Sequence, residues 1–333
     1  MTQSREVHLK RRPAGLPTAD AFELVTVDLP APGPGQALVR NLYLSVDPYM
    51  RGRMVDRKSY TPPFQLGEAM TGGAVGTVAA SNHADFAVGD TVLSMFGWRE
   101  AFLSDGRGLT KVDPTLAPAE SYLGVMGMPG MTAYFGLLDI GAPQPGETVF
   151  VSGAAGAVGS VACQIAKLKG CRVVGSAGSD AKVAWLTEIA GADAAFNYKT
   201  MPVPAALAKL CPDGVDVYFD NVGGDHLEAA LQRMNNYGRV VACGMISQYN
   251  ATEPTPAPRN LGLIVGKRIK MQGYIVSDYM DRAGEFYADM GAWLRDGKIV
   301  GEETVVEGIE HAADAFIGLF TGENLGKMLV KVG

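Results

Sequence analysis

Thr148–Gly175 reads TVFVSGAAGAVGSVACQIAKLKGCRVVG. An apolar strand over Thr148–Ser152 leads into a glycine loop, an amphipathic stretch over Val158–Lys169 and a second strand over Arg172–Gly175. This order is typical of a parallel βαβ unit that holds a phosphate group where the loop meets the helix. Repeated units of this kind form a doubly wound α/β domain.

The glycine loop Gly153–Gly159 is rich in small residues, which let a backbone approach a pyrophosphate closely. Its last glycine lets the helix pack tightly against the strand. Ala154 stands where a G-x-G-x-x-G pattern would have its first glycine, so the match is partial. A tight turn without a ligand is the alternative, and the surrounding βαβ unit favours a dinucleotide site.

Strands and helices continue to alternate through the middle of the chain, as in a parallel sheet covered by helices. The segments expected to form them are Lys182–Ala190, Ala194–Asn197, Val215–Asp220, His226–Met234, Arg239–Cys243, Ile269–Val276 and Phe286–Asp296. We therefore expect residues 126–300 to form one Rossmann-type domain.

The two ends of the chain have a different pattern. Before Pro129–Leu138, which is expected to be a helix, short strands broken by Gly and Pro predict a mixed or barrel-like β domain over residues 1–125. Thr304–Val306 and Lys327–Lys331 read as strands on either side of a helix over Ile309–Thr321. Residues 301–333 are therefore expected to return to the first domain.

Composition excludes several classes of protein. The 333 residues exceed what one hydrophobic core usually organises, and 29 basic against 35 acidic residues give a net charge of -6. No basic stripe is present, so we expect no nucleic-acid partner. Met1–Arg12 has no apolar run, and no window approaches the length of a membrane helix. We expect a cytoplasmic protein without a membrane segment.

Zinc alcohol dehydrogenases also combine a β domain with a dinucleotide domain, so metal ligands were sought. Catalytic zinc needs converging Cys, His and carboxylate ligands. The first 150 residues contain no cysteine and only His8 and His83. The cysteines have no CxxC spacing, which favours reduced, buried thiols: Cys163, Cys171, Cys211 and Cys243. We expect no metal.

The end of the second strand discriminates between the nicotinamide cofactors. NAD enzymes usually carry an acid there for the ribose 2′-hydroxyl. Here Gly175–Ser179 is small and acid-free, and Lys182 follows as a point charge for a 2′-phosphate. Asp180 is better explained by a helix start. Tyr198 is a second candidate for the phosphate, with core packing as its alternative. These residues predict NADP(H).

Several motifs in order carry a family resemblance. They are NLYLSVDPYMRG at Asn41–Gly52, GMPGMTAY at Gly127–Tyr134, FDNVGG at Phe219–Gly224, CGMISQYN at Cys243–Asn250 and GENLGK at Gly322–Lys327. Together with the glycine loop, they cover almost the whole chain. The chain resembles the zinc-free medium-chain reductases that include leukotriene B4 12-hydroxydehydrogenases (prostaglandin reductases), plant alkenal double-bond reductases and bacterial curcumin reductases, and is most similar to the bacterial members.

The resemblance implies a GroES-like β domain beside the Rossmann domain, NADPH as cofactor and a homodimer. It further implies NADPH-dependent reduction of the C=C bond of an α,β-unsaturated ketone or aldehyde, by hydride transfer to the β-carbon and protonation of the enolate. The implied cofactor-binding residues are Gly156, Ala157, Val158, Gly159, Ser179, Lys182, Tyr198, Asn221, Cys243, Gly244, Met245, Ile246, Ser247, Tyr274, Ile275, Val276 and Asn324.

A donor must stabilise the oxygen on which charge develops during this reaction. Tyr249 and Tyr49 are the candidates for this catalytic role and for substrate contact, and packing alone is the alternative for each. Tyr60 is a candidate for lining the substrate pocket, with a simply exposed side chain as its alternative. Several relatives carry a tyrosine where this chain has Val265–Lys267, so the stabilising group must differ or lie elsewhere.

Two other functions fit the same residues. An NADPH quinone reductase would share every cofactor residue and differ in its acceptor. A non-catalytic NADPH-binding protein would keep the fold without the reaction, because fold alone does not establish catalysis.

Overall fold

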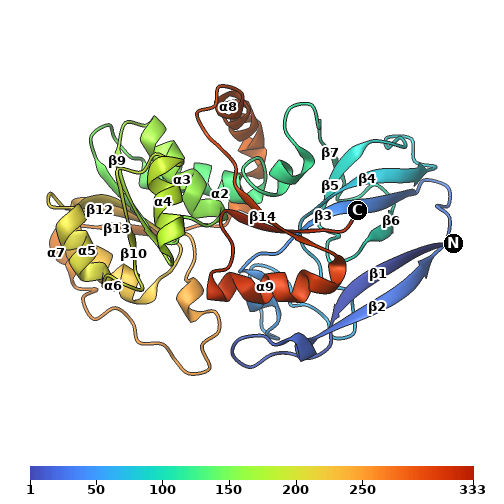
Figure 1. Ribbon diagram of the computed structural model, residues 1–333, viewed down its shortest axis with the longest axis horizontal. Coiled ribbons are helices and arrows are strands. Elements are labelled where there is room, and N and C mark those ends of the chain that lie inside the picture. Colours follow the sequence, from blue (N-terminus) through green and yellow to red (C-terminus); the bar gives the residue numbers. More distant parts are fainter. The chain divides into compact units, whose positions relative to one another are not determined.

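The computed structural model describes residues 1–333, which form two compact units (Figure 1). The first unit comprises Met1–Leu123 and Glu303–Gly333, and the second comprises Gly124–Glu302. The second unit is thus inserted into the chain of the first.

The second unit contains a six-stranded sheet in which every pair of neighbouring strands is parallel. Its order is β10-β9-β8-β11-β12-β13. The strands are β8 (Thr148–Val151), β9 (Arg172–Ala177), β10 (Ala194–Asn197), β11 (Val215–Asp220), β12 (Met234–Ala242) and β13 (Lys270–Gly273). Strand order reverses between β8 and β11, which is where open α/β sheets form a ligand crevice. The predicted doubly wound fold is confirmed.

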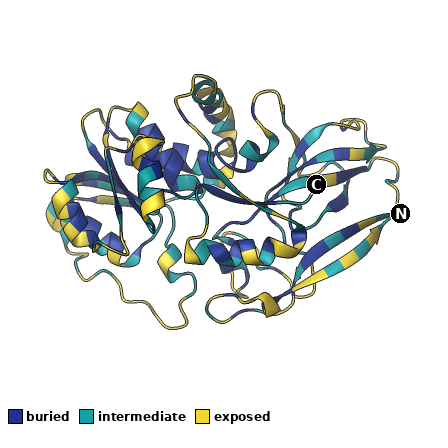
Figure 2. Ribbon diagram, in the orientation of Figure 1, coloured by how far each residue is buried: buried dark blue, intermediate teal, exposed yellow.

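Helices connect these strands and cover the sheet (Figure 1). They are α2 (Met128–Phe135), α3 (Ala157–Leu168), α4 (Asp180–Glu188), α5 (Val203–Leu210), α6 (Gly224–Arg233), α7 (Leu263–Lys267) and α8 (Ala283–Arg295). A π-helical segment, Gly136–Gly141, continues α2. The central strand β8 is buried along its whole length, as its apolar sequence requires. Figure 2 shows buried and exposed residues alternating along the helices that cover the sheet.

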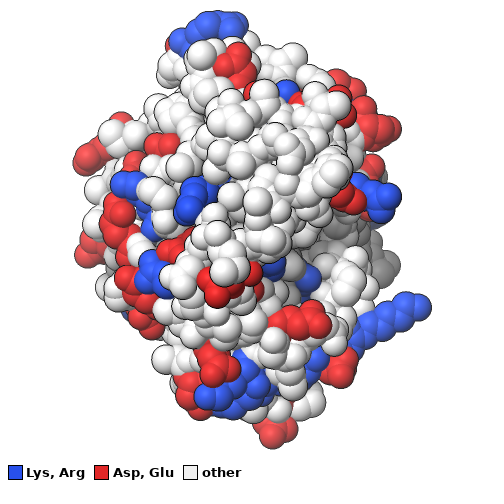
Figure 3. Space-filling view, turned by 90° about the vertical axis from the view of Figure 1, so that its right-hand side faces the viewer, with Lys and Arg blue, Asp and Glu red and all other residues white.

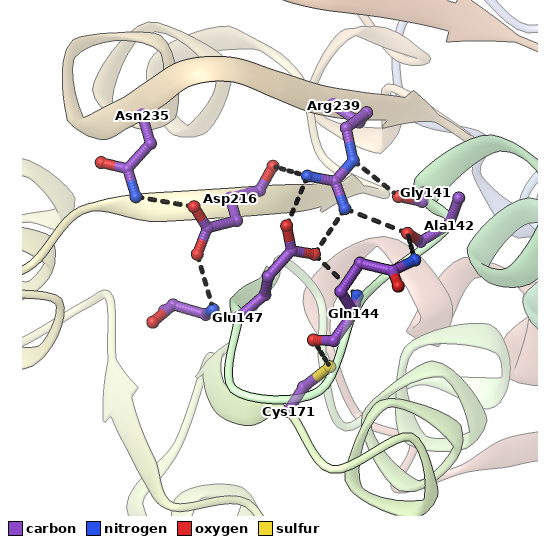
Figure 4. A network of polar contacts seen from close by, with 9 residues as sticks. Gly141, Ala142, Gln144, Glu147, Cys171, Asp216, Asn235 and Arg239 are labelled. Atoms are coloured by element: carbon purple, nitrogen blue, oxygen red, sulfur yellow. Dashed lines mark hydrogen bonds and ion pairs between the residues drawn. The ribbon is translucent and has the colours of Figure 1, made fainter.

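A charged network ties the amino-terminal ends of the central strands together (Figure 4). The Arg239 guanidinium on β12 donates to Glu147 at 2.9 Å and to the Gly141 carbonyl at 2.9 Å. The Asp216 carboxylate accepts from the backbone N–H of Thr148 at 2.8 Å and from the Asn235 amide at 2.7 Å. Burial alone would raise the pKa of Glu147, but its hydrogen bonds with Arg239 and the Gln144 backbone outweigh burial and lower it.

The first unit contains a hairpin, β1 (Thr2–Leu9) with β2 (Phe22–Leu29), and a mostly antiparallel sheet. The sheet consists of β14 (Glu303–Glu307), β15 (Lys327–Lys331), β3 (Ala37–Ser45), β4 (Ala74–Ser81), β5 (Thr91–Ser94) and β7 (Thr110–Lys111), in that order, with β6 (Ala101–Ser104) paired to β3. Its helices are α1 (Met50–Arg53) and α9 (Ala312–Thr321). A mixed β domain was predicted from the sequence, and this is confirmed.

The core of the first unit forms around Trp98, which is fully buried. Its ring stacks on Phe22 with centroids 6.1 Å apart and meets Phe316 of α9 edge-on at 6.0 Å. The hairpin, the sheet and the C-terminal helix therefore share one aromatic core.

Two strand predictions in the second unit were wrong in extent. β12 begins at Met234 rather than Arg239, because Met234 already pairs with Val215 of β11, and the polar stretch Asn235–Gly238 is an irregularity before Arg239 pairs with Val217. Within it Tyr237 has φ +63°. β13 ends at Gly273, and Val276 starts a 3-10 helix instead of extending the strand.

Acidic and basic side chains are interspersed on the face of the molecule drawn in Figure 3. That mixture is ordinary for a protein surface. None of the helices is both long and apolar enough to cross a bilayer.

One histidine is buried without a polar partner. His226 on α6 is 7% exposed, and its Nε2 has no hydrogen-bond partner. Its ring meets Tyr198 edge-on, with centroids 5.3 Å apart. Burial lowers the pKa of His226 from 6.5 to about 4, against a smaller opposing effect of Asp225.

We predict that His226 makes the protein less stable as the pH falls. Below pH 6.5 the unfolded chain binds a proton that the folded chain takes up only near pH 4, so stability decreases across that window. Between pH 7.5 and pH 5 this group should account for about 2 kcal/mol of lost unfolding free energy. His226→Phe keeps the ring contact and should remove that part of the loss in urea unfolding. His311→Phe, at an exposed position, is the control; equal pH dependence in His226→Phe and wild type would contradict the assignment.

Candidate functional site

The glycine loop lies between β8 and α3, as predicted. Gly156 is the N-cap residue of α3, and no side chain caps the helix. A Cβ on Gly159 would lie 2.4 Å from the Gly153 carbonyl oxygen, so only glycine lets the helix approach the loop this closely. The first-turn residues Ala157 and Val158 therefore have their N–H groups at an uncapped helix N-terminus, which suits a pyrophosphate.

Ser152 and Asp220 tie the two strands at the switch point together. Both side chains are fully buried, Ser152 directly after β8 and Asp220 at the end of β11. The Ser152 hydroxyl donates to Asp220 at 3.3 Å, and the Tyr218 hydroxyl donates to the same Asp220 oxygen at 2.7 Å. That oxygen also accepts the backbone N–H groups of Val222 at 3.0 Å and Gly223 at 2.8 Å. One carboxylate oxygen thus fixes the loop that follows β11.

Asn221, a predicted cofactor residue, is held in this loop. Its backbone N–H donates to the Ser152 hydroxyl at 3.0 Å, and its side-chain amide donates to the Ser152 carbonyl at 2.7 Å. The Asn221 side chain is thereby locked between the ends of the two strands. Burial raises the pKa of Asp220 despite its four donors.

The end of β9 carries no acid, as the sequence indicated. Ser179 is the N-cap of α4, and its hydroxyl accepts the Lys182 backbone N–H at 3.4 Å. Asp180 lies in the first helical turn, and its carboxylate accepts the Asn197 amide at 2.8 Å. The helix start expected at Asp180 is confirmed, with Ser179 as the N-cap and Asp180 in the first turn.

Tyr198 lies directly over the glycine that follows β9. A Cβ on Gly178 would be 2.8 Å from the Tyr198 hydroxyl oxygen, so a side chain at Gly178 would displace the phenol. Burial lowers the pKa of Lys182, and the charge of Lys199 lowers it further. The end of β9 therefore combines a glycine, a phenol and two cations, a set that fits the 2′-phosphate of NADP(H).

The segment after β12 is hydrogen-bonded to the segment after β11. Cys243 and Gly244 donate their backbone N–H groups to the Asp220 carbonyl at 2.9 and 3.0 Å. Ile246 donates to the Asn221 carbonyl at 3.2 Å, and Ser247 reaches the Val222 carbonyl through both its N–H and its hydroxyl. The structure thus brings together two groups of predicted cofactor residues that are far apart in sequence.

Two side chains of the segment after β12, Cys243 and Tyr249, differ in what they can do near neutral pH. Cys243 is half-buried, and desolvation of its thiol raises the pKa to about 12, so it is not a thiolate near neutrality. The half-buried Tyr249 accepts the Met245 backbone N–H on its phenol oxygen at 3.3 Å. Burial raises the pKa of Tyr249. The phenol is therefore neutral at physiological pH, and its O–H can donate to a further oxygen.

Tyr274, Ile275 and Val276 follow β13. The Tyr274 hydroxyl donates to the Thr132 carbonyl of α2 at 2.6 Å, above Gly136, where a Cβ would be 2.2 Å away. Its phenol therefore fixes α2, a structural role that the sequence did not indicate. Ile275 and Val276 are half-buried at the start of the 3-10 helix.

Tyr49, Tyr60 and Asn324 belong to the first unit. Tyr49 is half-buried and is the N-cap residue of α1, and Tyr60 is 62% exposed. The Asn324 amide donates to the Gly326 carbonyl at 2.7 Å. Burial strongly raises the pKa of Tyr49, so this phenol is also a neutral donor.

A buried ion pair anchors the turn that carries Tyr49. Lys327 of β15 is 2% exposed; its ammonium lies 3.2 Å from Asp47 and donates to the Val46 carbonyl at 2.8 Å. The Ser45 hydroxyl donates to the other Asp47 oxygen. The turn after β3 is thus fixed to the C-terminal strand of the same unit.

Sequence reasoning did not identify Ser152, Asp220 or Lys199 as parts of this site. A polar residue at the end of an apolar strand was the available signal for Ser152 and Asp220. Lys199 is distinguished only by its neighbour in space, Lys182. No group of three or more His, Cys, Asp or Glu side chains is arranged to hold a metal ion.

Comparisons with known proteins cover the whole chain. The family model described as the N-terminal domain of oxidoreductase matches residues 5–112, and the one described as zinc-binding dehydrogenase matches residues 157–294. NADPH-dependent curcumin reductase of Escherichia coli is 46% identical over 336 residues, 99% of this chain and 97% of that protein. The NADP(+)-dependent 2-alkenal reductase of Nicotiana tabacum is 44% identical over 337 residues, 99% of this chain and 97% of that protein.

A solved structure also matches this chain over nearly its whole length. The crystal structure of CurA from Vibrio vulnificus in complex with NADPH has a TM-score of 0.94 and 48% identity, and the match covers 99% of each chain. The family resemblance carried by the sequence motifs is confirmed. The chain belongs to the zinc-free, NADP-dependent oxidoreductases of the medium-chain dehydrogenase/reductase family.

Proposed function

We propose that the protein uses NADPH to reduce the C=C bond of α,β-unsaturated ketones or aldehydes. The observation that carries the proposal is the acid-free end of β9, where Lys182, Tyr198 and Gly178 suit a 2′-phosphate. The neutral phenol of Tyr249, after β12, is a candidate donor for the acceptor. Relatives named curcumin reductase and 2-alkenal reductase support the choice of acceptor. A homodimer remains a prediction.

The residues of the second unit have separate tasks in this proposal. The uncapped start of α3 at Gly156–Gly159 would hold the pyrophosphate, and Lys182 with Tyr198 would hold the 2′-phosphate. The two locked segments after β11 and β12 would line the remaining cofactor path, because the carboxyl ends of parallel strands build the crevice. Bound NADPH supplies the hydride for the β-carbon of the acceptor.

Tyr249 and Tyr49 are separate candidates for the donor to the enolate oxygen. Tyr249 holds its oxygen toward the Met245 N–H, which leaves its O–H to donate to the acceptor oxygen. Tyr49 is the alternative candidate, on a turn of the first unit fixed by Asp47 and Lys327. Both phenols have raised pKa values, so they act as neutral hydrogen-bond donors, and the α-carbon takes its proton from a phenol or from water.

A panel of acceptors tests the proposal against its alternatives. NADPH oxidation should proceed with 2-alkenals and enones and give the saturated carbonyl compound. Turnover of simple quinones with none of the enones would indicate a quinone reductase instead. Quenching of cofactor fluorescence without any NADPH consumption would indicate a binding protein.

Lys182→Ala should weaken NADPH binding and leave NADH binding almost unchanged. The ammonium is the group proposed to meet the 2′-phosphate, and a hydrogen bond to a charged group contributes about 1.5–3 kcal/mol, or roughly tenfold to a hundredfold in Kd. Cofactor fluorescence titration measures both values. Lys209→Ala, an exposed lysine on α5, is the matched control. Equal losses for the two cofactors would show that Lys182 does not contact the 2′-phosphate.

Tyr249→Phe should lower kcat for an enone while the Kd for NADPH is kept. Removing one donor to a developing oxyanion costs on the order of a hundredfold in rate. The Kd comes from fluorescence titration and kcat from NADPH consumption. Tyr237→Phe, 68% exposed in the same unit, should change neither. Unchanged kcat in Tyr249→Phe would remove this phenol from the mechanism.

A further inference from the structure

Asp180 is the first acidic residue after the glycine loop. Enzymes that bind NAD carry an acid about 20 residues beyond the glycines, where its carboxylate accepts the ribose 2′-hydroxyl. Asp180 stands just past the end of β9, in the first turn of α4, the helix that also carries Lys182. A carboxylate near this place favours NADH and repels the 2′-phosphate of NADPH. The placement of this side chain therefore bears on which cofactor is preferred.

The Asp180 carboxylate is held by an amide at the end of the neighbouring strand. Asn197, the last residue of β10, donates from its Nδ2 group to Asp180 Oδ1 at 2.8 Å. The Oδ1 atom of the same amide accepts the backbone N–H of Lys199 at 3.0 Å. Because a backbone N–H requires an acceptor, the amide oxygen must face Lys199, and its NH₂ group then faces Asp180.

The backbone of Asn197 is fixed by the strand before it and the turn after it. Its carbonyl accepts the N–H groups of Thr200 at 3.1 Å and Met201 at 2.9 Å. Asn197 lies opposite Ala177 in the parallel pair of β10 with β9, and Tyr198 donates its backbone N–H to the Ala177 carbonyl at 3.1 Å. The amide therefore projects toward α4 from a fixed position.

Asn197 connects this acid to the groups proposed for the 2′-phosphate. Tyr198 is the next residue along the chain, and Lys182 shares the first turns of α4 with Asp180. All of these residues belong to the second unit. A carboxylate hydrogen-bonded at the end of β10 leaves the start of α4 to the phosphate. A carboxylate released from the amide would seek another donor, and the 2′-hydroxyl of NADH is one.

We propose that Asn197 is a positioning residue for cofactor specificity: its amide holds the Asp180 carboxylate at the end of β10, so that this acid neither takes the 2′-hydroxyl of NADH nor repels the 2′-phosphate of NADPH. The inference rests on the cofactor contacts of the proposed function and explains how an acid at this point is compatible with NADPH. Asn197 acts through Asp180.

Asn197→Ala should move the affinities for the two cofactors in opposite directions. Because Asp180 is released, the Kd for NADPH should rise about fivefold and the Kd for NADH should fall about twofold in fluorescence titrations. A merely structural loss would weaken both cofactors alike. Asn197→Ser keeps an acceptor for the Lys199 N–H on a shorter side chain and should give the same signs, which covers poor folding of Asn197→Ala.

Asn235→Ala is the matched control. It removes a similar contact, 2.7 Å from the Asn235 amide to the Asp216 carboxylate, at the amino-terminal ends of the strands. It should leave the ratio of the two Kd values unchanged.

Asp180→Asn tests whether Asn197 acts through the acid. It keeps an oxygen that can accept the Asn197 amide and removes the carboxylate, so NADPH should bind at least as tightly as to wild type. In this background Asn197→Ala should no longer improve NADH binding, because no carboxylate is left to release.

Equal losses for NADPH and NADH in Asn197→Ala, or the same shift of their Kd ratio with and without the Asp180 carboxylate, would overturn the role of Asn197. Enone turnover by the wild-type protein would uphold the proposed function in that case. Opposite shifts of the two Kd values in a protein that turns over no enone would uphold the role of Asn197 and overturn the proposed reaction.

Discussion

The contact between Ser152 and Asp220 is the constraint on which the dinucleotide edge of this protein depends. It joins β8 to β11 at the point where the strand order reverses, and both side chains are fully buried. A buried carboxyl group is costly unless it is hydrogen-bonded. Here one Asp220 oxygen takes two hydroxyls and two backbone N–H groups, whereas the other has no partner, and burial raises the pKa of the group. The loops after β11 and β12 follow from this tie, because the second is hydrogen-bonded to the first.

The amino-terminal ends of the same strands are held together by a charged network. Arg239, Glu147 and Asp216 join the amino-terminal ends of the central strands through charge-assisted hydrogen bonds. Because the central strands are restrained at both ends, the loops that follow them are held in fixed positions. Such rigid support is what a binding edge built from loops requires.

The sequence predicted the second unit well because its signals are local. The glycine loop, the apolar strand before it and the acid-free end of β9 each lie within one short segment, and β10 and β11 were predicted with their observed bounds. Tyr274 shows the limit of this reasoning. Its hydroxyl is used by the Thr132 carbonyl, 142 residues away, and no local pattern reports such a partner.

Delivery of hydride to a carbon–carbon double bond is tested by following the hydride itself. The purified protein would be given NADPH carrying deuterium in the transferable position and an enone such as trans-3-decen-2-one, and the product examined by NMR and mass spectrometry. We expect one deuterium on the β-carbon of the saturated ketone and a solvent-derived hydrogen on the α-carbon. Deuterium on the carbonyl carbon of an allylic alcohol would contradict it.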